Sequence, residues 1–223
     1  MSDRSSDADD LRGSGVLMGR IAGIPIFVTP TWLLVAVAIT LSFAPSEQRL
    51  PGLGDWRYAV SFAFAVLLYL SVLVHELSHS LTALALGLRV RRITLHLLGG
   101  ASEIAQEPRT PGAEFLIAFA GPAVSLVLAG VGYVAAQALD PAAVAGFLVL
   151  LLAGANLLLG IFNLLPALPL DGGRLLAAGV WKLAGRRLTG VLIAAAAGRV
   201  LAVLLLALPL LGLLRGGRPD PFS

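Results

Sequence analysis

Two histidines and a glutamate fall within five residues, in the segment His75-Glu76-Leu77-Ser78-His79. On a helix, residues four apart project from nearly the same face, one turn from each other. His75 and His79 can therefore direct their ring nitrogens at one metal ion, with Glu76 beside them. This is the two-histidine zinc arrangement in which the glutamate acts as general base. The spacing predicts a zinc site on a helix.

The surroundings of this motif strengthen that interpretation. Residues 58–74 contain no charged side chain, and a mostly apolar stretch continues beyond the motif to residue 88. Ionisable groups at membrane depth are costly, so they are retained mainly where they pair, bind an ion or take part in chemistry. A solvated helix face does not exist inside a bilayer. The placement therefore predicts a zinc site within a membrane.

The composition indicates a membrane protein. The chain has 223 residues, of which 57% are hydrophobic and 13% charged, and its mean hydropathy is +0.89. A soluble globular domain has about 25% charged residues. The chain contains no cysteine, which excludes disulfides and thiolate ligands. Any transition metal must therefore be held by His, Asp or Glu.

The positions of the basic residues predict how the chain is oriented in the membrane and do not indicate nucleic-acid binding. The net charge is +3, but the arginines and lysines fall in the segments between apolar runs, which is the pattern of membrane topology. They concentrate before the first run, after the second and after the fourth. The positive-inside rule places the N-terminus and these segments in the cytosol. About 18 residues of helix, roughly 27 Å, precede His75, which puts the motif toward the cytosolic side.

The apolar runs predict an all-α polytopic membrane protein with five to six transmembrane helices. Five runs are clear, at about 26–43, from 57 through the motif, 114–138, 142–165 and 191–214. A sixth helix at 175–184 is too short to cross alone. We expect residues 1–15 to be a polar, disordered tail, 16–214 the membrane domain and 215–223 a C-terminal tail.

A small β-hairpin is expected between the second and third spans. Residues 91–104 alternate partly between polar and apolar, and the alternation breaks at Gly99-Gly100. Unpaired strand edges cannot face lipid, so the hairpin belongs at the membrane interface or in a protein-lined cavity. Its edge could pair with an extended peptide. A plain interfacial loop is the alternative.

A catalytic zinc ion normally has three protein ligands and one open position. The third histidine, His96, lies in the expected hairpin beside three arginines, where a structural role fits better. Asp171 is the best carboxylate, at the end of an apolar approach broken by Pro166 and Pro169. Backbone groups freed by these prolines require a protein-lined cavity. Asp171 can also cap a helix that starts near Gly172, and the two roles are compatible.

At this point the chain resembles the site-2 protease family of polytopic intramembrane zinc metalloproteases. The resemblance rests on the His75–His79 motif followed by Asn163-x-x-Pro166-x-x-Pro169-Leu170-Asp171-Gly172-Gly173, in the family's order. Gly121-Pro122-Ala123-Val124-Ser125 looks like the family's Gly-x-x-x-Asn/Ser/Gly element, a weaker signal. The likeness covers about residues 17–206.

The resemblance implies a set of site residues. The ligands of one Zn²⁺ per chain would be His75, His79 and Asp171, and Glu76 would be the catalytic base. Asn163 matches an asparagine that helps to position the substrate or the oxyanion, although such a residue can also simply hydrogen-bond between helices. Gly99 and Gly100 resemble part of the family's membrane-associated strands and are candidates for substrate binding.

The implied function is hydrolysis of a peptide bond within or near a transmembrane helix of a substrate protein, in regulated intramembrane proteolysis. The expected partners are that substrate and the lipid bilayer, and the expected location is the cell membrane, as a multi-pass protein. We expect no CBS or PDZ domain, and the sequence carries no signal of an oligomeric state.

Three alternatives remain open. A catalytically inactive zinc-binding regulator is disfavoured by the intact Glu76. A transporter is disfavoured because the polar groups concentrate at one depth and show no inverted repeat. A metalloprotease acting on prenylated C-termini is disfavoured by the Asn163–Gly173 element.

Overall fold

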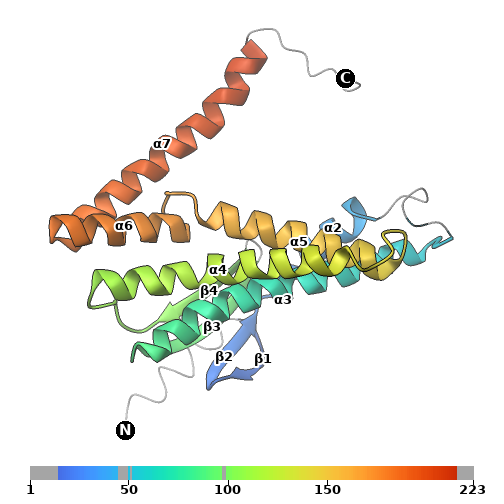
Figure 1. Ribbon diagram of the computed structural model, residues 1–223, viewed down its shortest axis with the longest axis horizontal. Helices are drawn as coiled ribbons and strands as arrows, with labels where there is room; N and C mark the ends of the chain where they lie inside the picture. Colours follow the sequence, from blue (N-terminus) through green and yellow to red (C-terminus); the bar gives the residue numbers. More distant parts are fainter. Residues whose placement is uncertain (1–14, 45–49, 51, 97–98, 215–223) are drawn as a thin grey trace.

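The computed structural model describes residues 15–44, 50, 52–96 and 99–214, with side chains described to residue 207 (Figure 1). Both expected tails lie outside the described residues, apart from Gly15. The elements are mostly helices, joined by one small sheet that lies beside the helix α3 (Trp56–Ala85).

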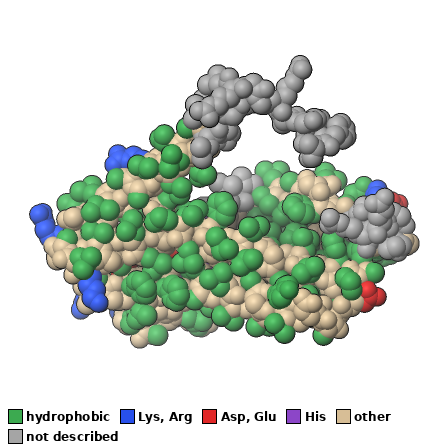
Figure 2. Space-filling model, turned by 45° about the horizontal axis from the view of Figure 1, so that its top comes forward, with side chains coloured by type: hydrophobic (Ala, Val, Ile, Leu, Met, Phe, Trp, Pro, Cys, Tyr) green, Lys and Arg blue, Asp and Glu red, His purple; other side chains and the backbone are tan. Residues whose placement is uncertain are grey.

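Four of the described helices are long and apolar enough to cross a membrane, namely α3, α4 (Pro111–Ala136), α5 (Val144–Asn163) and the Arg187–Ala207 part of α7 (Arg187–Leu214). They correspond to four of the five predicted runs. Their outward faces carry large exposed hydrophobic side chains, such as Val131, Leu158 and Val203, each more than 60% exposed. In Figure 2 such side chains cover the middle of the molecule, and Lys and Arg gather toward one end. Apolar surface of this extent is what a helix presents to lipid.

The first predicted span is wrong in its extent. Its beginning belongs to strand β2 (Ile24–Val28), and only α2 (Trp32–Ser42) is helical. Eleven residues of helix extend about 16 Å, roughly half the hydrocarbon thickness. Pro30 separates the two elements, because a proline cannot donate to a strand ladder and readily begins a helix. Composition alone does not distinguish a buried strand followed by a short helix from one spanning helix.

The short sixth segment forms the helix α6 (Asp171–Ala184), which has 14 residues and is not among the helices long enough to span. It runs back along α4 and leads into α7, which leaves the bundle at an angle (Figure 1). Gly185 ends α6 in the left-handed conformation that glycine adopts without strain.

The sheet is larger than the predicted hairpin. Its strand order is β1-β2-β3-β4, with β1 (Val16–Ile21), β3 (Val90–His96) and β4 (Gly99–Ile104). Strands β3 and β4 are antiparallel, as predicted, while β2 joins β3 in parallel. The N-terminal hairpin β1–β2 was not predicted, because its turn uses Ala22 at φ 51° beside Gly23. Alanine is unusual at a position with positive φ, so the sequence pattern does not indicate a hairpin turn here.

The sheet is anchored on α3 by an apolar cluster. Ile24 of β2 and Ile93 and Leu95 of β3 are buried against one another, and α3 contributes side chains that include Leu73 and Leu77. This contact leaves β4 at the edge of the sheet, alongside the α3 segment that carries the two histidines. The sheet therefore supports the candidate site directly.

A glycine substitution tests how α7 is attached. A Cβ on Gly190 would overlap the carbonyl oxygen of Ala177 in α6, so we expect Gly190→Ala to destabilise the protein by about 1–3 kcal/mol. The measurement is thermal unfolding in detergent. Gly179→Ala is the matched control, because that position in α6 faces open space and alanine is the better helix former. Equal melting temperatures for the two variants would contradict the packing described here.

Candidate metal centre

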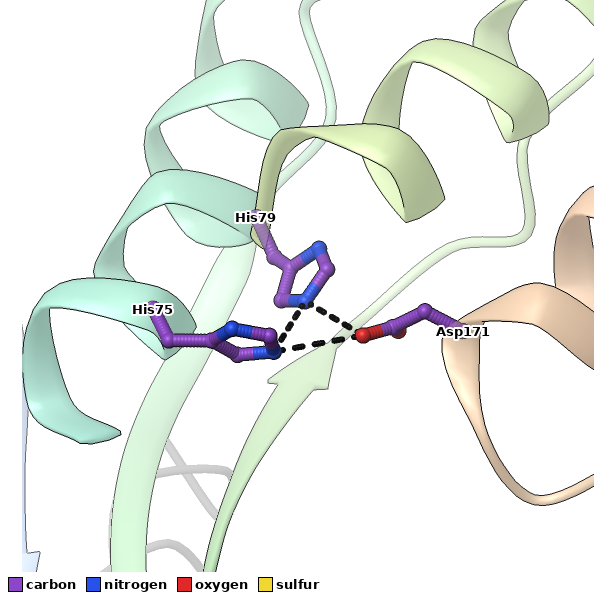
Figure 3. Close-up of side chains that lie close together, drawn as sticks. All are labelled: His75, His79 and Asp171. Atoms are coloured by element: carbon purple, nitrogen blue, oxygen red, sulfur yellow. Dashed lines mark hydrogen bonds and ion pairs between the residues drawn. The ribbon is translucent and has the colours of Figure 1, made fainter. Parts of the chain in front are cut away.

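Among the described residues, one group of His, Asp and Glu side chains is close enough to hold a metal ion. It consists of His75, His79 and Asp171, all buried (Figure 3). The two histidine Nε2 atoms are 3.2 Å apart, and each is 3.2 Å from Asp171 Oδ2. The histidines come from the C-terminal third of α3 and the aspartate from the first turn of α6. The fold thus brings Asp171 to His75, which lies 96 positions earlier in the chain.

The triangle of ligand atoms fits a tetrahedral metal ion. Bonds of about 2.0–2.1 Å in tetrahedral geometry hold ligand atoms roughly 3.3–3.4 Å apart, close to the 3.2 Å separations seen here. A carboxylate is one of the ligand types that bind zinc, and a cation between these atoms would favour the ionised form of Asp171.

The backs of both imidazole rings are held by α4. His79 Nδ1 is 2.6 Å from the carbonyl oxygen of Ile117, which can only accept, so Nδ1 carries the proton. His75 Nδ1 lies 2.9 Å from Ser125 Oγ. A proton on Nδ1 leaves the Nε2 lone pair free to bind a metal, and such outer contacts fix both tautomer and ring orientation. Ser125 belongs to the Gly121–Ser125 element, the weaker part of the family resemblance, and it contacts a histidine of the candidate site.

Gly121 allows α4 to approach the two rings. A Cβ at this position would overlap Nε2 of both His75 and His79. The Gly-x-x-x-Ser spacing thus has a physical explanation, since the glycine makes room for the rings and the serine one turn later reaches His75.

Asp171 is placed by the loop that precedes α6. Cβ atoms on Gly172 and Gly173 would overlap backbone atoms of residues 164–168, so glycine lets this loop fold tightly over the helix start. Leu170, not Asp171, is the N-cap residue, and the carboxylate points at the histidines instead. The predicted capping role is therefore wrong.

An ion pair lies behind Asp171. Arg174 Nε donates to Glu114 Oε1 at 2.8 Å, and Arg174 Nη1 is 3.9 Å from Asp171 Oδ1. Glu114 belongs to the first turn of α4 and is 8% exposed. Arg174 thus stands on the Oδ1 side of the carboxylate, while Oδ2 faces the rings. Neither residue stands out in the sequence as part of the site, because their pairing depends on a contact between α4 and α6.

Glu76 is turned toward the sheet. Its Oε2 accepts a hydrogen bond of 2.7 Å from Ser102 Oγ of β4, and a Cβ on Gly100 would overlap Glu76 Cγ. Gly100 therefore lies directly against the predicted base. Gly99, its neighbour, pairs with His96 and faces open space at φ 141°.

Two other residues singled out in the sequence lie apart from the triangle. Asn163 ends α5 and donates to the carbonyl of Leu159 in its own helix at 3.0 Å. His96 ends β3, and its backbone carbonyl accepts from the Tyr69 hydroxyl at 3.3 Å.

Comparison with known proteins identifies the family. Residues 63–145 and 138–208 match the family model of peptidase family M50. The chain belongs to this family, which includes the site-2 proteases. The M50 match covers most of α3, all of α4, α5 and α6 and the first part of α7, and therefore all three residues of the triangle.

Individual relatives agree with the M50 assignment. Proteins of Synechocystis sp. and Mycobacterium tuberculosis, both named as zinc metalloproteases, are 42% and 40% identical over 90% of this chain. These alignments cover 53% and 52% of the relatives, so the chain spans about half the length of the curated relatives it matches. The solved structure of the site-2 protease from Methanocaldococcus jannaschii is 34% identical, with a TM-score of 0.62, and the match covers 90% of this chain and 85% of that chain.

The close approach of α4 yields a prediction about metal binding. We expect Gly121→Ala to weaken zinc affinity about 10- to 100-fold. The substitution changes no ligand, but its methyl group would displace the Nε2 atoms of both histidines. Zinc content of the purified protein and competition with a chelator measure this. Gly130→Ala, at an open position of the same helix, should bind zinc like the wild type. Wild-type affinity in Gly121→Ala would show that the rings do not bind a metal in this arrangement.

Proposed function

We propose that this chain is an intramembrane zinc metalloprotease that hydrolyses a peptide bond within or near a transmembrane helix of a substrate protein. The observation that carries the proposal is the buried triangle of two Nε2 atoms and one carboxylate oxygen, in which both histidines lie on a helix long and apolar enough to span a membrane. Membership of family M50 and relatives named as zinc metalloproteases support zinc as the metal.

In this proposal His75, His79 and Asp171 hold one Zn²⁺. Three protein ligands would leave a coordination position of the ion open for water or substrate, as in other catalytic zinc sites. When bound, zinc supplies Lewis-acid activation of water and of the scissile carbonyl. The contacts of Ile117 and Ser125 with the Nδ1 atoms would keep the rings aimed at the ion.

Glu76 is the general base in this mechanism. It follows the ligand His75 directly in α3, and its carboxylate takes a proton from the attacking water. The same carboxyl group then delivers that proton to the departing amine. Because the carboxylate contacts β4, the reaction takes place between α3 and the edge of the sheet.

The substrate must present an extended segment to this site. The carbonyl groups of a transmembrane helix are hydrogen-bonded within the helix, so the helix has to unwind locally before water can attack. We expect cleavage near helix-destabilising residues, toward the cytosolic side of the membrane. The edge strand β4, with Gly99 and Gly100, offers backbone groups with which an unwound segment can pair. Asn163 is proposed to assist in positioning that segment.

Two substitutions test the proposal. We expect Glu76→Gln to retain zinc and to lose at least about a hundredfold in the cleavage rate, because the amide cannot act as a base. We expect Asp171→Ala to lose zinc and activity together, because one ligand is removed. The measurements are zinc content and cleavage of a single-helix reporter substrate in detergent.

Glu103→Gln is the matched control, since this carboxylate of β4 is partly exposed and paired with Arg91 and Arg92 on the other side of the sheet. It should retain both zinc and cleavage. Full cleavage by a zinc-loaded Glu76→Gln variant would refute the proposed mechanism.

A further inference from the structure

Ser102 of β4 is the polar residue that links the sheet to the proposed base. Its hydroxyl oxygen lies 2.7 Å from Glu76 Oε2, 3.1 Å from the Glu76 backbone carbonyl and 3.1 Å from Ser80 Oγ. Ser80 belongs to the turn of α3 that follows Glu76 and is fully buried. Three polar groups of one helix segment therefore converge on a single side chain of the sheet.

The direction of these hydrogen bonds favours the carboxylate. Ser80 donates its proton to Ser102 Oγ. The single hydroxyl proton of Ser102 can therefore be donated either to Glu76 Oε2 or to the backbone carbonyl oxygen of Glu76. A hydrogen bond to an ionised acceptor is shorter and stronger than one to a neutral carbonyl, and the carboxylate contact is the shorter here. The chain Ser80–Ser102–Glu76 thus ends on the proposed base.

The pleat of β4 explains why this contact forms. Gly100 and Ser102 lie two residues apart and pair with Leu95 and Ile93, whose side chains are buried toward α3. They therefore face α3, whereas side chains at the intervening positions face the other way. Gly100 leaves the space that Glu76 Cγ needs, and Ser102 binds the carboxylate beyond it.

We propose that Ser102 is a positioning residue for Glu76, so that the edge strand of the sheet sets where the general base lies. This inference rests on the proposed function of Glu76. It predicts an effect on the chemical step and none on metal binding, because Ser102 contacts the base and the two histidine ligands are oriented from α4.

The test compares Ser102→Ala with Ser102→Thr in zinc-loaded protein, using a single-helix reporter substrate in detergent. We expect Ser102→Ala to lower kcat about 10- to 100-fold, with KM and zinc content unchanged, because a hydrogen bond to a charged group is lost. Ser102→Thr retains the hydroxyl and suits a strand, so it should restore most of kcat. Ala101→Ser is the matched control, since it adds a hydroxyl to the opposite face of the same strand.

A double-mutant cycle separates positioning from a general structural role. In the Glu76→Asp background the shorter side chain no longer reaches Ser102, so Ser102→Ala should cause little further loss of kcat. A merely structural serine would cause the same loss in both backgrounds. Full kcat in Ser102→Ala, or equal losses in both backgrounds, would overturn the inference while the wild type still cleaves.

A second cycle needs no substrate and keeps the inference separate from the proposed function. Thermal unfolding of the purified protein in detergent should show a lower melting temperature for Ser102→Ala than for wild type. The decrease should be smaller when Glu76→Ala is already present, because only the hydrogen bonds of Ser102 with Ser80 and with the backbone carbonyl of residue 76 are then lost. Equal decreases in both backgrounds would show that Ser102 does not act through Glu76. Failure of the proposed function alone would appear as a wild type that neither binds zinc nor cleaves, with this coupling intact.

Discussion

The structure depends on three electron-rich atoms held 3.2 Å apart in a buried site, Nε2 of His75 and His79 and Oδ2 of Asp171. Such atoms repel one another in an apolar environment, and a bound cation turns that repulsion into attraction. Because the ligands come from α3 and α6, ion binding also stabilises the packing of these helices. The surrounding elements contact the outer sides of the ligands and leave the inner sides to the metal.

Close backbone approach is the means by which this site is built. Gly121 brings α4 against the imidazole rings, Gly100 brings β4 against Glu76, and Gly172 lets the preceding loop fold over the start of α6. At each position a single methyl group would overlap an atom of the site or of its support. These glycines therefore have a steric role beside the chemically active residues in the folded chain.

Local patterns predicted much of this arrangement, and long-range contacts accounted for the rest. The four-residue spacing of His75 and His79, four of the five apolar runs and a hairpin between the second and third runs all depend on neighbouring residues, and the structure contains them. Gly99 and Gly100, however, belong to strand β4, although the sequence predicted a turn there. The link from Ser102 to Glu76 and the ion pair behind Asp171 join residues 26 and 60 positions apart. No spacing rule predicts such pairs, and an apolar run such as 26–43 does not reveal that a strand precedes its helix.

The misassigned N-terminal segment also serves the site. Strand β2 pairs with β3 in parallel, and Ile24 packs with Ile93 and Leu95 in the cluster that fixes the sheet on α3. The position of β4, and with it the hydroxyl that binds the proposed base, depends on that anchoring. The free edge of β4 is where we expect an unwound substrate to pair, so one sheet would hold both the substrate and the base. Substrate alignment and base alignment would then share one rigid support, which favours a reproducible geometry for attack.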